Sequence, residues 1–155
     1  MVGMRSWVRA GLSVLVAIAI WLGIGTISEA GAIASPANVN LVTDVQVHLG
    51  TAAEALTFVP NHLDFVAGRK YRLILDNPSS VKHYFTAKDF ADSIWTQKVE
   101  AGNVEIKGAI HDLELKPGAI AEWVFVPLKS GTYSLRCTIA GHEAAGMVGE
   151  IAIAP

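Results

Sequence analysis

The sequence predicts an all-β domain built from two packed sheets, a β-sandwich, preceded by a leader segment. After residue 34, apolar and polar residues alternate with a period of two, which is typical of strands with one buried face. Clusters of glycine, proline, asparagine and serine separate the alternating runs, and no run shows the apolar stripe of a long helix. Roughly six to eight short strands in about 120 residues fit a sandwich, with a barrel as the alternative.

The expected strands follow one another between recognisable turns. Turn residues stand at Gly68, at Asn77-Pro78, at Pro117-Gly118 and at Gly131. Alternation is weakest between residues 87 and 108, where we expect either a short helix near residues 89–92 or only loops. The alternating apolar residues that mark the strands are Val45, Val47 and Leu49; Leu56 and Phe58; Tyr71, Leu73 and Leu75; Ala121, Trp123 and Phe125; Tyr133, Leu135 and Cys137; and Ile151 and Ile153.

The first 34 residues have the order of a secretory signal peptide. Arg5 and Arg9 precede nineteen residues without a charged side chain, Ala10 to Ser28. A small-residue stretch that ends in Ala32-x-Ala34 follows, as at a cleavage site. The alternative is an uncleaved membrane anchor, although an apolar stretch of about 26 Å is slightly short for a bilayer core.

Either reading of the leader divides the chain into residues 1–34 and a folded domain of residues 35–155. It also places this domain outside the cytoplasm, in the periplasm or, in a photosynthetic source, in the thylakoid lumen. A membrane contact is expected only if the leader stays uncleaved.

Charge and cysteine content exclude several classes of function. The whole chain carries a net charge of −2, and residues 35–155, with 10 basic and 13 acidic side chains, carry about −3. Nucleic-acid binding needs a concentrated basic face, and the sequence shows none. Cys137 is the single cysteine, which excludes an intramolecular disulfide, a four-cysteine zinc site and an iron–sulfur cluster held by cysteines alone.

A loop near the C-terminus contains the side chains best suited to bind a metal. Residues 138–146 separate the last two expected strands, and this connection is longer than an ordinary hairpin turn. Cys137 stands at its start, His142 in its middle and Met147 at its end. A thiolate, an imidazole and a thioether are soft ligands, and a trigonal site of two histidines and one cysteine with a distant methionine suits copper. The pattern therefore predicts a copper site that needs one more histidine.

His83 is the best candidate for that second histidine. It follows the strand of Tyr71, Leu73 and Leu75 and the turn at Asn77, so its loop can reach the same end of a sandwich as the cysteine loop. The three remaining histidines, His48, His62 and His111, have polar or turn-forming neighbours, and we expect them on the surface. Trp95 and Trp123 are expected to pack in the core or around the site.

These segments resemble the cupredoxins, the small blue copper proteins. Cys137-x4-His142-x4-Met147, preceded by Gly131-x-Tyr133-x-Leu135, is similar to the copper loops of azurin-, auracyanin- and rusticyanin-type members. Residues 77–83 resemble the loop that carries the first histidine in the family, and the likeness spans about residues 39–154.

The resemblance implies a Greek-key sandwich and one mononuclear type 1 copper held by His83, Cys137, His142 and Met147. In many members an asparagine follows the first histidine and ties the two ligand loops together. Tyr84 takes that place here, so the resemblance does not supply this tie.

The resemblance implies an electron carrier that cycles between Cu(II) and Cu(I). We expect a monomer that meets redox proteins by weak, transient contact near His142. An enzyme such as a copper nitrite reductase or an oxidase fragment is disfavoured, because Arg136 and Thr138, not a histidine, flank Cys137 and the chain has the length of one domain. Copper delivery, storage or resistance remains open, because the same ligands serve either role.

Overall fold

The computed structural model describes residues 41–155, so the predicted leader lies outside the described residues. Within residues 41–155 no helix is long and apolar enough to cross a membrane. The elements of this part are β1 (Thr43–Leu49), β2 (Phe58–Val59), β3 (His62–Val66), β4 (Tyr71–Asp76), β5 (His83–Thr86), α1 (Lys88–Ala91), β6 (Ile94–Ala101), β7 (Val104–Ile106), β8 (Asp112–Leu115), β9 (Ile120–Pro127), β10 (Gly131–Arg136) and β11 (Val148–Ala154).

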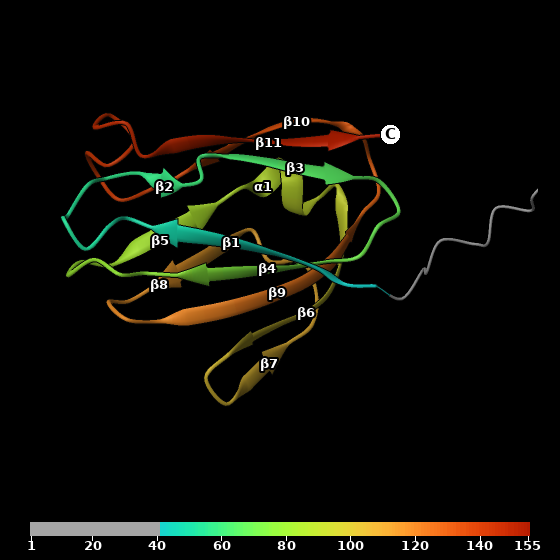
Figure 1. Ribbon diagram of the computed structural model, residues 1–155, viewed down its shortest axis with the longest axis horizontal. Coiled ribbons are helices and arrows are strands. Elements are labelled where there is room, and N and C mark those ends of the chain that lie inside the picture. The colour runs from blue at the N-terminus through green and yellow to red at the C-terminus, as the bar shows by residue number, and fades with distance from the viewer. Residues whose placement is uncertain (1–40) are drawn as a thin grey trace, which may run out of the picture. The chain divides into compact units, whose positions relative to one another are not determined.

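The strands form two separate sheets, so the predicted sandwich is confirmed over the alternative barrel. One sheet has the order β2-β1-β4-β9-β6-β7 and the other β3-β11-β10-β5-β8 (Figure 1). The pairs β1/β4 and β3/β11 are parallel, whereas the neighbouring strands in the rest of both sheets are antiparallel. Two parallel strands cannot be joined by a tight hairpin turn, so the chain crosses several times from one sheet to the other.

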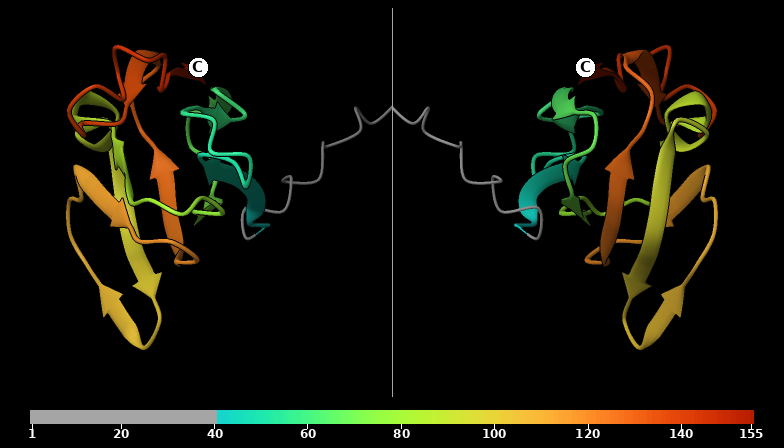
Figure 2. Two further views of the ribbon diagram at one scale, coloured as in Figure 1. Left: turned by 90° about the vertical axis from the view of Figure 1, so that its left-hand side faces the viewer. Right: turned by 90° about the vertical axis from the view of Figure 1, so that its right-hand side faces the viewer.

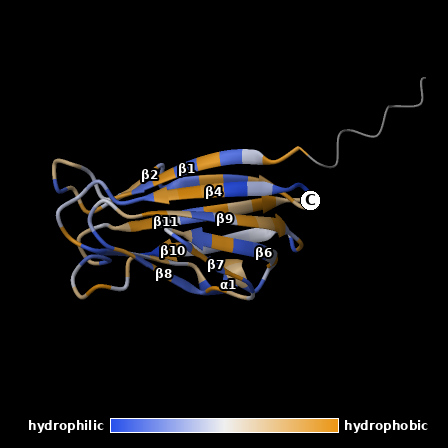
Figure 3. Cartoon of the chain, turned by 90° about the horizontal axis from the view of Figure 1, so that it is seen from below, coloured by the Kyte–Doolittle hydropathy of each residue, from blue (hydrophilic) through white to orange (hydrophobic). Residues whose placement is uncertain are grey.

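The core lies between the sheets and explains the alternating sequence. In β4, Tyr71, Leu73 and Leu75 are buried, while the residues between them are half-buried on the outer face. Figure 3 shows the same alternation as apolar and polar bands along β1, β4 and β6. Trp123 is almost completely buried and its Nε1–H donates to Thr96 Oγ1 at 3.1 Å, which satisfies the indole donor inside the core.

The region of weak alternation proves more regular than its sequence indicates. The expected short helix is present as α1, but β6 and β7 also form there, and residues 41–155 hold eleven strands rather than six to eight. A β-bulge between Thr96 and Lys98 interrupts the register of β6 with β9, and this break hides the period of two. The β6–β7 hairpin extends beyond the rest of the sandwich (Figure 2).

Trp95 corrects a second expectation. It was expected in the core or around the site, but it is 58% exposed at the beginning of β6, where its neighbour Ile94 takes the inward position. Strand alternation places successive side chains on opposite faces, so only one of the two can be buried. Trp123 packs as expected, with its ring edge-on to Phe85 and Phe90.

The strands bring three loops to one end of the sandwich. Residues 50–57, 77–82 and 137–147 gather at the left of Figure 1. The carboxylate of Glu54 accepts the N–H of Ser80 at 3.1 Å, which joins the first two loops. The third loop follows β10, which pairs with β5 through Arg136 and Thr86. The segments that carry the predicted ligands therefore meet at this end.

Candidate metal centre

Backbone hydrogen bonds within residues 137–147 fix the cysteine loop. Cys137 follows the last residue of β10, and its N–H donates to the carbonyl of Met147 at 3.1 Å, which closes the loop at its base. Inside the loop, the N–H of Met147 donates to the carbonyl of His142 at 2.9 Å, and the N–H of His142 donates to Ile139 at 3.0 Å. Gly146 has a φ of +101°, a conformation that glycine adopts without a steric penalty. The loop thus holds its three candidate ligands by its own main chain.

His83 is the first residue of β5 and points inward, with 0% of its surface exposed. Burial lowers the pKa of His83, and the nearby His142 lowers it further. A neutral imidazole keeps a lone pair on one ring nitrogen, which is the form that binds a metal. The environment of His83 therefore favours its ligand form.

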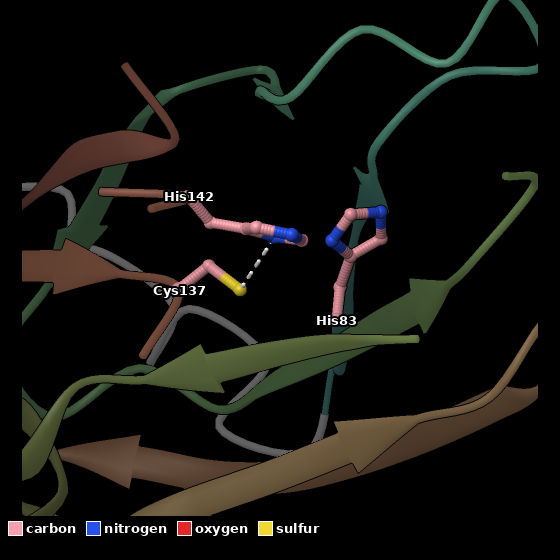
Figure 4. A group of neighbouring side chains, drawn as sticks. All are labelled: His83, Cys137 and His142. Atoms are coloured by element: carbon pink, nitrogen blue, oxygen red, sulfur yellow. Dashed lines mark hydrogen bonds between the residues drawn. The ribbon is translucent and has the colours of Figure 1, made fainter. Parts of the chain in front are cut away.

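The three side chains of His83, Cys137 and His142 converge, as Figure 4 shows. One candidate ligand atom from each residue lies within 4.8 Å of the others. Cys137 Sγ is 3.5 Å from His142 Nδ1, and the two imidazole ring centres are 5.1 Å apart. The prediction that His83 joins the cysteine loop, rather than His48, His62 or His111, agrees with this arrangement.

One polar atom in the cluster has no partner. Among residues 41–155, Nδ1 of His83 is the buried side-chain nitrogen or oxygen that makes no hydrogen bond. Buried polar atoms are nearly always paired, and such an exception needs an explanation. A metal ion bound between the imidazoles and the thiolate would give this nitrogen a partner, and the nitrogen and sulfur donors suit copper. The residues present fit the metal that the sequence predicts.

Met147 is completely buried at the end of the loop, and its carbonyl accepts the N–H of Cys137. Its role as a weak fourth ligand stays a prediction.

Two contacts join the strand of His83 to the cysteine loop without an asparagine. The backbone N–H of Tyr84 donates to Cys137 Sγ at 3.4 Å, across 53 residues of sequence. The hydroxyls of Thr86 and Thr138 lie 3.2 Å apart. The phenol of Tyr84 points elsewhere and donates to the carboxylate of Glu114. A main-chain donor and a pair of threonines therefore connect the two ligand segments, a connection that an asparagine makes in many proteins of the type the sequence resembles.

The other histidines lie where the sequence predicts. His48, His62 and His111 are half-exposed, and each lies beside a carboxylate: Asp76 at 2.7 Å from His48, Asp64 at 3.2 Å from His62, and Asp92 at 2.7 Å from His111. They do not approach the cluster of His83, Cys137 and His142.

Sequence reasoning missed three residues that surround His83. Ser79 Oγ lies 2.8 Å from His83 Nε2, and Asn77 Oδ1 lies 2.8 Å from the same hydroxyl. Gly50 packs against the ring so closely that a Cβ atom there would lie 2.7 Å from Nε2. Asn77-Pro78-Ser79 reads as a turn in the sequence, and only the burial of Asn77 and Ser79 distinguishes it from an exposed turn.

A family model of copper binding proteins, the plastocyanin/azurin family, matches residues 45–154. The chain belongs to this family. The match runs from within β1 to the end of β11 and includes all four predicted ligands. A comparison with curated protein sequences finds no match at a significant level.

Solved structures of the same fold include two auracyanins. Auracyanin from the photosynthetic bacterium Roseiflexus castenholzii is 19% identical, with a TM-score of 0.52, over 73% of this chain and 98% of that one. Auracyanin A, a "blue" copper protein from Chloroflexus aurantiacus, is 17% identical, with a TM-score of 0.51, over 73% of this chain and 99% of that one.

A larger protein shares the fold as well. The McoA multicopper oxidase of Aquifex aeolicus is 14% identical, with a TM-score of 0.58, over 78% of this chain but 31% of that one. At these identities the likeness shows the family fold and leaves the choice between carrier and enzyme to the chain's own residues.

The geometry predicts that His83 is needed for metal binding and His111 is not. We expect His83→Ala to weaken copper binding by at least tenfold, because it removes one of three converging donors. His111→Ala, which removes an imidazole paired with Asp92, serves as the matched control and should keep the parent affinity. Competition with a copper chelator measures both. Unchanged affinity in His83→Ala would exclude it as a ligand.

Proposed function

We propose that this chain is a type 1 copper electron carrier, with His83, Cys137, His142 and Met147 holding the metal. The cluster of one buried thiol, one buried imidazole and one half-buried imidazole, with an unpartnered ring nitrogen on His83, carries the proposal. Bound copper would supply one-electron chemistry by cycling between Cu(II) and Cu(I). Membership in a copper-binding family supports the choice of metal.

The protein would hold the ligand atoms in fixed positions and shield them from water. His83 and Cys137 are fully buried, and main-chain hydrogen bonds fix the loop of residues 137–147. Ligands that move little when the charge of the metal changes keep the reorganisation on electron transfer small. The rigid loop is therefore suited to rapid exchange of single electrons.

His142 is the candidate exit for electrons. It is half-buried, whereas His83 and Cys137 are fully buried, so its imidazole is the donor nearest to solvent. Ala140, Ala144 and Ala145 beside it are exposed and small, and Glu143 is the charged residue among them. A small apolar surface of this kind suits weak, brief docking of a redox partner.

Two further parts of the proposal rest on the sequence. The leader pattern of residues 1–34 supports a location outside the cytoplasm, with redox proteins of the periplasm or lumen as partners. A carrier is favoured over an enzyme because Arg136 and Thr138 flank Cys137, whereas copper enzymes of this fold pass electrons to a second centre through an adjacent histidine. Copper delivery, storage or resistance is the alternative, because the same ligands serve either role.

The decisive experiment is the visible spectrum of the copper-loaded protein. We expect an intense blue or green colour in the oxidised form, from charge transfer between thiolate and copper. Cys137→Ser should abolish this band, because the alcohol does not supply a thiolate. The zinc-loaded parent, which should be colourless, is the control. An unchanged band in Cys137→Ser would refute the assignment.

Met147 is proposed as a weak ligand that tunes the metal. We expect Met147→Leu to keep copper and colour but to raise the reduction potential, because loss of the thioether donor would disfavour Cu(II). Voltammetry of the variant and the parent measures the shift. Complete loss of copper in Met147→Leu would show instead that the thioether is a main ligand.

The docking surface can be tested by adding a charge. Ala144→Glu should leave the spectrum unchanged but slow self-exchange and transfer to a partner about tenfold, equivalent to about 1.4 kcal/mol on the barrier. Ala154→Glu is the matched control, because it adds the same charge to an exposed alanine at the far end of β11. Stopped-flow and NMR line-broadening measure the rates. Parent rates in Ala144→Glu would place the exit elsewhere.

A further inference from the structure

A chain of buried polar groups stands behind His83, on the side of the ring away from Cys137 and His142. Ser79 Oγ is 2.8 Å from His83 Nε2, and Asn77 Oδ1 is 2.8 Å from Ser79 Oγ. Ser79 is 4% exposed and Asn77 is 1% exposed. Buried polar groups cost free energy unless they are hydrogen-bonded, so the direction of each hydrogen bond here is fixed by the available partners.

The amide of Asn77 has a defined orientation. Its Nδ2 lies 2.8 Å from the carbonyl of Val81 and 2.8 Å from the carbonyl of Leu115, and both of these atoms only accept. Its Oδ1 accepts the backbone N–H of Ser79 at 3.0 Å. A reversed amide would set its oxygen against two carbonyls and its NH₂ against an N–H donor. Oδ1 must therefore face the hydroxyl of Ser79.

The direction of the Ser79 bond follows. The hydroxyl has one proton, and its neighbours Asn77 Oδ1 and the carbonyl of Val81, at 2.8 and 2.9 Å, are both pure acceptors. If this proton pointed at His83 instead, Ser79 Oγ would face both acceptor oxygens with no proton between them, and the buried Nδ1 of His83 would carry an N–H without an acceptor. The proton therefore goes to one of the two oxygens, and towards His83 the serine oxygen acts as an acceptor. Nε2 of His83 must then carry the ring proton, and Nδ1 keeps its lone pair. That lone pair belongs to the unpartnered atom of the metal site.

The backbone of Gly50 closes the same side of the ring. Its φ is +78°, and a Cβ atom there would lie 2.7 Å from His83 Nε2 and 3.2 Å from Ser79 Cβ. The contact leaves little room for water beside Nε2, so Ser79 provides the acceptor. Rotating the ring by half a turn would put a carbon in the place of Nε2 and remove the hydrogen bond between His83 and Ser79.

We propose that Ser79, oriented by Asn77, is a positioning residue that fixes the Nε2-protonated tautomer and the ring orientation of His83 before any metal binds. The consequence for copper rests on the proposed function: the lone pair of Nδ1 is already aimed at the thiolate and at His142, so no tautomer change precedes binding. The tautomer itself is a property of the apoprotein and can be measured without copper.

The first test uses the unaltered apoprotein. In protein labelled with ¹⁵N at histidine, the nitrogen shifts and ring couplings of His83 should report a single Nε2–H tautomer, with its proton exchanging slowly with water. An Nδ1–H tautomer, or a mixture of the two, would overturn the proposal. This measurement does not depend on the folding of any variant.

The second test removes the hydroxyl. Ser79→Ala should give a mixture of His83 tautomers in the apoprotein and weaken copper binding about 10- to 100-fold. Ser80→Ala is the matched control, because Ser80 is exposed and bonds Glu54 through its backbone N–H. Ser79→Thr, which keeps a hydroxyl, should restore the single tautomer. A single Nε2–H tautomer and parent affinity in Ser79→Ala would refute the role of Ser79.

The two proposals fail in different ways. If the apoprotein shows the Nε2–H tautomer but the copper-loaded protein has no charge-transfer band, the copper assignment fails and the role of Ser79 stands. If the band is present but His83 carries its proton on Nδ1 in the apoprotein, the copper site stands and the positioning role is wrong.

Discussion

The end of the sandwich where the candidate copper ligands meet depends on one short pairing between two strands distant in sequence. β5 meets β10 only through Thr86 and Arg136, yet this pairing sets His83 beside Cys137. The N–H of Tyr84 completes the junction by donating to the sulfur. The two sheets supply the stability that this junction lacks, because a single bridging pair cannot order two loops alone. Apolar burial between the sheets, at about 25 cal/mol per Å², is the main force that holds the pair in register.

Polar groups collect at the end of the sandwich where the core stops. Asn77, Ser79 and His83 are all buried there, and hydrogen bonds satisfy their donors and acceptors except for one nitrogen of His83. An unsatisfied buried polar atom costs about 1–3 kcal/mol. A metal that binds the folded chain and not the unfolded one relieves this cost, so metal binding and folding stability are linked.

The sequence predicts most of the fold and the ligand cluster, because the signals for them are local. The spacing of Cys137, His142 and Met147 lies in one loop, and strand alternation marks the core. The roles of Ser79 and Asn77 depend on partners such as Leu115, 38 residues from Asn77, and no local pattern encodes such a bond. The bulge in β6 hides that strand, and the sequence around Trp95 does not show which face its side chain takes.

The bond from Tyr84 to the sulfur is made by the main chain, and this frees position 84 from the metal site. Every amino acid except proline has the N–H that Cys137 Sγ accepts here. Any substitution at this position except proline therefore keeps the N–H donor to the sulfur. In this chain the side chain at position 84 is a phenol that donates a hydrogen bond to Glu114 on the neighbouring strand β8. This bond adds a side-chain link between β5 and the edge strand of the sheet.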